Sequence, residues 1–143
     1  MFIAHNHAHI FTIAFGAGPR TILGIGGWIG SWELWAEPFA LLSSTWRTIA
    51  YDHRGSGATV APVATITVAN MVDDLFAVMD AYDVAQCVLA AESAGAVVAL
   101  QAALTRPERI TGLVLVDGLA YRPPAPEGQD PFLDGLRTAW SGG

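Results

Sequence analysis

Short apolar segments alternate with segments of helical character along most of this chain, and this alternation constrains the fold more than any other feature. The apolar segments, each expected to be a strand, are 21–25, 47–51, 84–91 and 110–116. The expected helices between them are 32–42, 67–81 and 94–105. Apolar strands separated by helices form parallel sheets through right-handed crossovers. The sequence therefore predicts an α/β fold with a mainly parallel sheet, the four strands adjacent, and helices on both faces.

Local signals place the ends of these elements. In the segment 67–81 apolar side chains recur at three- and four-residue spacing, which is typical of an amphipathic helix. Ser31 is expected to cap the helix 32–42, with Glu33 in its first turn. The helix 94–105 is built of small residues and ends before Pro107, because a proline disfavours helical backbone in the residue before it.

The N-terminal segment 1–18 alternates weakly and ends in a Gly-Ala-Gly-Pro turn signal, which predicts a short hairpin. His5, His7 and His9 follow one another at every second position and would share one face of a strand. They could chelate a metal or form the polar side of an edge strand. The segment contains no Cys, Asp or Glu to complete a metal site, so the second interpretation is favoured and no metal is predicted.

Composition limits the partners of the chain. Charged residues make up only 14%, against roughly 25% in an average globular protein. Such a composition suits a sheet buried on both faces, or a fragment whose missing half covers apolar surface. The net charge of −6 argues against nucleic acid and anionic membranes as partners. Cys87, the single cysteine, is expected to be an inert buried side chain and cannot form an internal disulfide. The first cationic residue is Arg20, so the N-terminus lacks the basic segment of a signal peptide. Together these features favour a cytoplasmic location.

The strongest chemical signal is Ala90-Ala91-Glu92-Ser93-Ala94-Gly95, between an expected strand and an expected helix. A nucleophile at a tight strand-to-helix turn is lifted clear of the sheet, and the residues two positions away must be small. Ala91 replaces the first glycine of the usual G-x-S-x-G pattern. Ser93 also fits a plain helix cap, but the context favours a nucleophile with a strained backbone and an exposed Oγ.

A second signal is the glycine loop Gly26-Gly27-Trp28-Ile29-Gly30-Ser31, directly after the first expected parallel strand. Acyl transfer places negative charge on a carbonyl oxygen, and backbone N–H groups must already point at it. The expected donors are the N–H groups of Trp28 and Ala94. The alternative is a dinucleotide phosphate loop, but the glycines do not fit the G-x-G-x-x-G register, so no cofactor is predicted.

A third segment is Asp52-His53-Arg54-Gly55-Ser56-Gly57. With it, the chain resembles the N-terminal half of the α/β-hydrolase superfamily. Members typically carry an H-G-x-x-G-S loop, a D-x-R-G-x-G loop, the nucleophile elbow and a strand similar to Leu113-Val114-Leu115-Val116-Asp117, and here all four occur in that order over roughly 10–120. The resemblance implies that 1–121 is the N-terminal part of a hydrolase core domain whose C-terminal strands are missing. Residues 122–143 would then begin a lid or cap segment, with a helix starting at Asp130 and Pro131.

The resemblance also implies a catalytic triad in the chain order Ser, Asp/Glu, His. All four histidines precede Ser93, so the triad base is absent from this chain. Asp117 is a candidate triad acid, with a structural role as the alternative. His53 is a candidate base, against a role in loop packing. A serine rather than an aspartate at the elbow argues against the dehalogenase and epoxide-hydrolase branches.

The resulting hypothesis is a serine hydrolase, similar to esterases or lactonases, present as a catalytically incomplete fragment. Its partner would be a small-molecule ester or acyl substrate, and its unpaired sheet edge would favour self-association. One alternative is a non-catalytic binding protein or remnant of the same fold. Another is an acyltransferase or cofactor-free oxidase, since fold alone does not determine function.

Overall fold

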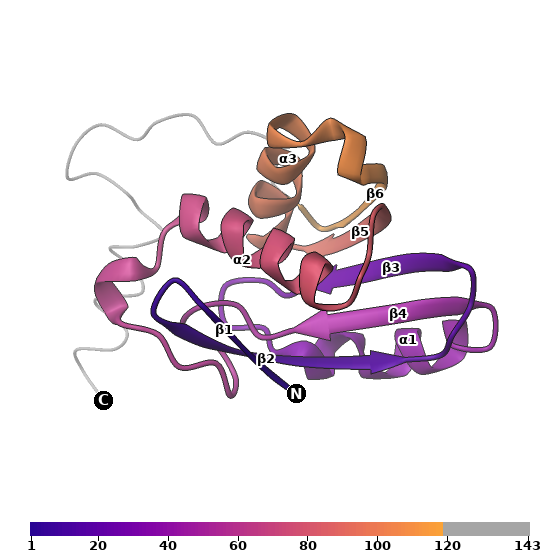
Figure 1. Ribbon diagram of the computed structural model, residues 1–143, viewed down its shortest axis with the longest axis horizontal. Helices are drawn as coiled ribbons and strands as arrows, with labels where there is room; N and C mark the ends of the chain where they lie inside the picture. Colours follow the sequence, from indigo (N-terminus) through magenta and orange to yellow (C-terminus); the bar gives the residue numbers. More distant parts are fainter. Residues whose placement is uncertain (119–143) are drawn as a thin grey trace.

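The computed structural model describes residues 1–118, which form a six-stranded mixed sheet in the order β1-β2-β4-β3-β5-β6 (Figure 1). The strands are β1 (Phe2–His5), β2 (Ala8–Phe15), β3 (Arg20–Ile25), β4 (Trp46–Tyr51), β5 (Cys87–Glu92) and β6 (Ile110–Val116). The α-helices are α1 (Ala36–Leu42), α2 (Val68–Ala81) and α3 (Gly95–Thr105). Short 3₁₀ turns occupy Trp32–Trp35, Val63–Thr65 and Pro107–Arg109.

The four predicted parallel strands are confirmed as neighbours. β3 pairs in parallel with β4 on one side and with β5 on the other, and β5 pairs in parallel with β6. The chain thus leaves β3 for β4 and then crosses back over β3 to reach β5. A crevice at the carboxyl ends of the strands is expected where the strand order reverses in this way, so β3 and β5 bracket the place for a site.

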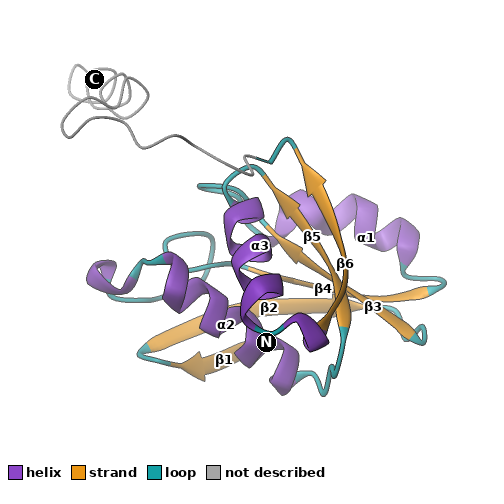
Figure 2. Ribbon diagram, turned by 90° about the horizontal axis from the view of Figure 1, so that it is seen from above, coloured by secondary structure: helices purple, strands orange, loops and turns teal. Residues whose placement is uncertain are grey.

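Helices cover both faces of the sheet, as predicted (Figure 2). On one face α1 packs through Phe39, and Trp35 stacks on Phe39 with ring centroids 5.3 Å apart. A Cβ at Gly24 would lie 2.7 Å from the Trp35 ring, so the glycine in β3 lets the indole rest on the sheet. On the other face α2 and α3 pack over a larger apolar core, whose helical members include Leu75, Val78, Met79, Val98 and Ala99.

The N-terminal hairpin is present, but its turn corrects one expectation. β1 and β2 pair antiparallel around Asn6 and His7, whose φ angles are +41° and +62°. A two-residue hairpin turn needs positive φ at both central residues. His5 and His9 therefore lie on different strands with His7 in the turn, and the prediction that the three histidines share one strand face was wrong. Within residues 1–118, no group of three His, Cys, Asp or Glu side chains is arranged to hold a metal.

Other differences concern the ends of elements. β5 begins at Cys87 rather than at 84, because the turn at Asp83, where φ is +53°, is followed by a bend at residues 85 and 86. The expected helix 32–42 begins as a 3₁₀ turn, and Ser31 does not cap it: its hydroxyl donates to the Glu33 carboxylate at 2.7 Å. The expected lid or cap segment 122–143 lies outside the described residues. Among residues 1–118, no helix is both long enough and apolar enough to cross a bilayer.

Cys87 is buried in the core, as expected. Burial raises the pKa of its thiol to about 12. A thiol with this pKa stays protonated at neutral pH, and a protonated thiol is a poor nucleophile. Cys87 therefore acts as a core side chain.

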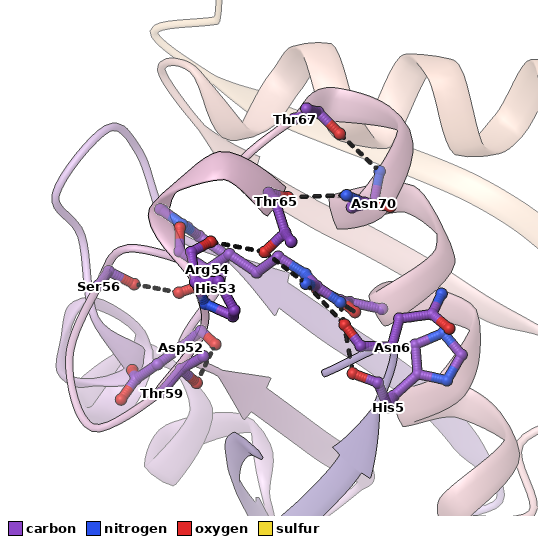
Figure 3. A network of polar contacts seen from close by, with 12 residues as sticks. His5, Asn6, Asp52, His53, Arg54, Ser56, Thr59, Thr65, Thr67 and Asn70 are labelled. Atoms are coloured by element: carbon purple, nitrogen blue, oxygen red, sulfur yellow. Dashed lines mark hydrogen bonds and ion pairs between the residues drawn. The ribbon is translucent and has the colours of Figure 1, made fainter. Parts of the chain in front are cut away.

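A fully buried ion pair joins the loop after β4 to α2. The Arg54 Nε donates to Asp74 Oδ2 at 2.6 Å and Nη2 donates to Asp74 Oδ1 at 2.8 Å. Nη1 donates to the carbonyl of Asn6 at 3.0 Å and to the Thr65 hydroxyl at 2.9 Å (Figure 3). The hydrogen bond to Asp74 raises the pKa of Arg54, against the opposing effect of burial. One side chain thus ties the β1–β2 turn, the loop after β4, and α2 together.

We expect Asp74→Asn to lower the free energy of unfolding by about 3–5 kcal/mol, because it leaves the buried guanidinium without a counter-charge. Asp80→Asn is the matched control, since it removes the exposed ion pair between Asp80 and Arg109 and should cost less than about 1 kcal/mol. Urea denaturation followed by tryptophan fluorescence measures both. An equal loss of unfolding free energy in the two variants would contradict the prediction that the buried pair contributes more to stability than the exposed one.

Candidate active site

The turn between β5 and α3 holds Ser93 in a conformation that few residues adopt. Its φ angle is +49°, in the left-handed region, and the serine is half-buried. The N–H of Ser93 donates to the carbonyl of Val116 at 3.0 Å, and its own carbonyl accepts from Ala96 at 3.1 Å. The strained backbone expected for the turn is therefore present, and hydrogen bonds on both sides of the residue hold it.

The second small residue of the elbow, Gly95, meets a steric demand. A Cβ at this position would lie 2.5 Å from the carbonyl oxygen of Gly26 and 2.9 Å from that of Ile25. These are backbone atoms at the end of β3, which cannot move aside as a flexible side chain could. Gly95 thus allows the start of α3 to pack directly against the glycine loop.

The glycine loop after β3 lies against the elbow. A Cβ at Gly27 would lie 3.2 Å from the Cβ of Ser93 and 3.1 Å from the carboxyl carbon of Glu92. The loop closes on itself through a hydrogen bond from Gly30 N–H to the Gly27 carbonyl at 3.2 Å. The Glu92 carboxylate was not singled out from the sequence, since no pattern tells where the residue before the nucleophile directs its side chain.

The two residues that carry the expected oxyanion donors line one cavity. A cavity of about 470 Å³ opens beside the elbow, and its lining includes Trp28 and Ala94. Within residues 1–118, the backbone N–H groups of these two residues donate to no other atom. Apolar side chains dominate the rest of the lining: Ile25, Ile29, Ile66, Val68, Met71, Val97 and Val98.

Asp52, first in the D-x-R-G-x-G segment, has a structural role. Its carboxylate accepts hydrogen bonds from the backbone N–H groups of Trp32 and Ala58, each at 2.7 Å. It therefore joins the segment after the glycine loop to the loop after β4. This role was not predicted, because the partners are backbone groups that carry no sequence signature.

Both ring nitrogens of His53 lie against backbone carbonyls, although the residue lines the same cavity as Ala94. Its Nε2 lies 2.6 Å from the carbonyl oxygen of Gly27, and its Nδ1 lies 2.9 Å from that of Arg54. The side chain is buried, and no hydrogen bond joins it to Ser93 in the described part of the chain. The geometry favours the loop-packing interpretation over the candidate base.

Asp117 follows β6 directly, next to the elbow. The preceding residue, Val116, accepts the hydrogen bond from Ser93 N–H, which places this end of β6 beside the nucleophile turn. Asp117 has a φ angle of +50° and is exposed, and its carboxylate has no hydrogen bond to another described residue. A triad acid acts by orienting a histidine. Its role as the acid stays a prediction.

Comparison with known proteins agrees with this geometry. The family model described as the alpha/beta hydrolase fold matches residues 20–138. The chain belongs to this family. The predicted resemblance and fold class are thereby confirmed.

Similar proteins come from bacteria and plants. "Putative carbamate hydrolase RutD" of Caulobacter vibrioides is 38% identical over 103 residues, which cover 71% of this chain and 38% of the relative. Among solved structures, a hydrolase from Pseudomonas aeruginosa matches with a TM-score of 0.83 and 26% identity, over 97% of this chain and 51% of that one. An epoxide hydrolase from Vigna radiata matches with a TM-score of 0.80 and 29% identity, over 98% of this chain and 45% of that one. The α/β-hydrolase chain described here thus spans about half or less of the length of these relatives.

We expect Gly95→Ala to destabilise the protein by about 1–3 kcal/mol, because the added methyl overpacks the contact between α3 and the backbone of Gly26 and Ile25. Gly112→Ala in β6 is the matched control: its Cβ would meet Val88 at an ordinary 3.6 Å. That variant should be neutral or gain up to about 1 kcal/mol, since glycine weakens a strand interior. Thermal or urea unfolding of both variants provides the measurement. A Gly95→Ala variant as stable as the control would show that the elbow has room for a side chain.

Proposed function

We propose that this chain carries the nucleophile and the oxyanion donors of a serine hydrolase that cleaves esters, lactones or related acyl compounds. The observation that supports the proposal most is the conformation of Ser93, held at φ +49° directly before Ala94, which lines the cavity together with Trp28. A strained serine at a strand-to-helix turn is the arrangement that serine hydrolases of this fold use for nucleophilic attack.

In the proposed reaction, Ser93 Oγ attacks the substrate carbonyl carbon, and its proton passes to a base that is not among residues 1–118. The carbonyl oxygen gains negative charge and accepts hydrogen bonds from the N–H groups of Trp28 and Ala94. Collapse of this intermediate expels the alcohol, which takes the proton, and leaves an acyl ester on Ser93. Water then attacks that ester and releases the acid. Asp117 would orient the base, from its place beside the elbow.

The chemistry of serine favours acyl substrates over epoxides. Attack by a hydroxyl on an epoxide produces an ether, which has no carbonyl for water to attack in a second step. Attack on an ester, lactone or carbamate produces an acyl-enzyme that water can hydrolyse. The names of the relatives include both a carbamate hydrolase and an epoxide hydrolase, and Ser93 fits the acyl chemistry of the first. The mainly apolar cavity suits a small organic acyl group.

A second candidate function is binding without catalysis. It is favoured by the position of His53, whose ring nitrogens lie against the backbone carbonyls of Gly27 and Arg54. A cytoplasmic location and self-association belong to either candidate. The exposed apolar side chains of the edge strand β6, namely Leu113, Val114, Leu115 and Val116, would support the self-association.

We expect the purified chain to hydrolyse p-nitrophenyl acetate slowly, because loss of one triad member cost roughly 10⁴- to 10⁶-fold in a characterised serine protease. Added imidazole should supply a base and increase acetylation of Ser93, detected by mass spectrometry of the digested protein. Ser93→Ala should abolish this modification.

Ser43→Ala is the matched control, because Ser43 is also half-buried but lies at the C-terminal end of α1, where its hydroxyl donates to the Ala40 carbonyl at 2.7 Å. It should leave acetylation of Ser93 unchanged. If the acetyl group is found on other residues and never on Ser93, with or without imidazole, the nucleophile assignment fails and the binding function is favoured.

A further inference from the structure

The carbonyl of Gly27 and the N–H of Trp28 belong to the same peptide group. This group is planar and trans, so its carbonyl and its N–H point in opposite directions. Any contact that fixes the direction of the Gly27 carbonyl therefore also fixes the direction of the Trp28 N–H. This N–H is one of the two oxyanion donors in the proposed function.

The glycine loop is poorly suited to fix this peptide alone. Gly26, Gly27 and Gly30 leave the backbone conformationally free. The Trp28 side chain does not anchor the loop, since it is 58% exposed. Within the loop, the Gly27 carbonyl accepts only the Gly30 N–H, at 3.2 Å. The shorter contact comes from outside the loop, from His53 Nε2 at 2.6 Å.

We propose that His53 is a positioning residue for the oxyanion site, and that its Nε2–H holds the Gly27–Trp28 peptide with the Trp28 N–H directed at the reacting oxygen. The inference rests on the proposed function. A carbonyl oxygen only accepts hydrogen bonds, and a neutral imidazole has one N–H. We therefore place the proton on Nε2, which makes the shorter of the two carbonyl contacts, 2.6 Å against 2.9 Å for Nδ1. Donation to the carbonyl also polarises the peptide and strengthens its N–H as a donor.

His53 is itself held rigidly. Its backbone carbonyl accepts from the N–H of Ser56 at 3.0 Å and from the Ser56 hydroxyl at 3.1 Å. The next residue, Arg54, is fixed through its guanidinium by Asp74. The imidazole thus connects the loop after β4, which these contacts support, to Gly27 of the glycine loop, 26 positions away in the sequence.

The positioning role differs from that of a general base. A base must offer a lone pair to Ser93 Oγ, whereas Nε2 donates its proton to Gly27. Glutamine tells the two roles apart, because its side-chain amide can donate a hydrogen bond at about the same reach but cannot accept the proton of Ser93. His53→Gln should therefore preserve positioning, and His53→Leu should abolish it while keeping an apolar side chain of similar size.

The first test is nuclear magnetic resonance of the full chain, labelled with ¹⁵N and ¹³C. In His53→Leu we expect the Gly27 carbonyl and Trp28 amide resonances to shift or broaden, because the peptide loses its stronger donor. In His53→Gln both resonances should stay close to those of the wild-type chain. If His53→Leu does not fold, His53→Asn replaces it, since its shorter amide does not reach Gly27. Unchanged Gly27 and Trp28 resonances in the variant without the donor would overturn the proposal.

The second test is the rate at which a fluorophosphonate modifies Ser93 in the presence of imidazole, measured by mass spectrometry. Loss of one oxyanion donor typically costs about 10²- to 10³-fold. We expect a loss of this size in His53→Leu and a loss of less than about tenfold in His53→Gln. A His53→Gln variant as slow as His53→Leu would overturn the positioning role and favour a base.

The two tests also separate this inference from the proposed function. Ser93→Ala serves as a second reference, and adding His53→Leu to it should change the Gly27 and Trp28 resonances by as much as His53→Leu changes them in the wild-type chain. If Ser93 is never modified but the resonances respond to His53 as expected, the nucleophile assignment fails and the control of the peptide by His53 is supported.

Discussion

Arg54 donates two hydrogen bonds to Asp74 in the protein interior, and the loops around the candidate site depend on this pair. Neither charge reaches water, so each must be neutralised by the other and its remaining donors satisfied nearby. The guanidinium meets this requirement by also binding the carbonyl of Asn6 and the hydroxyl of Thr65. The pair therefore fixes the loop that carries His53 relative to the sheet and to α2. Burial raises the pKa of Tyr51 above its usual value, and the negative charge of Asp74 adds to this effect.

The site itself lies where the strand order reverses. β3 is followed by α1 on one face of the sheet, and its neighbour β5 is followed by α3 on the other (Figure 2). The connections that follow β3 and β5 therefore run to opposite faces of the sheet and leave a crevice between them at this edge. Gly27 and Gly95 permit their close approach, because a side chain at either position would meet atoms of the opposite segment. Steric demand and topology thus bring the glycine loop and the start of α3 to the border of one cavity.

Much of the fold could be predicted from the sequence because it follows from local periodicity. The apolar segments became the four parallel strands, and the elements expected at 67–81 and 94–105 became α2 and α3 within one residue at each end. The error at the N-terminus has a local cause as well. Asn6 and His7 adopt left-handed backbone, which their residue types tolerate but do not require, so His5, His7 and His9 gave no sign of a turn between them.

The sequence by itself determined the α/β sheet, the small residues of the elbow and the serine at its tip, since these depend on the order and size of neighbouring residues. Only the tertiary structure decided which polar groups meet. Asp52 bonds to the N–H of Trp32, and Arg54 reaches both Asp74 and the carbonyl of Asn6, 48 positions earlier. His53 lies against Gly27 in the same way. Hydrogen bonds are directional and act over about 3 Å. Such contacts between distant segments exist only once the sheet has brought its loops to one edge.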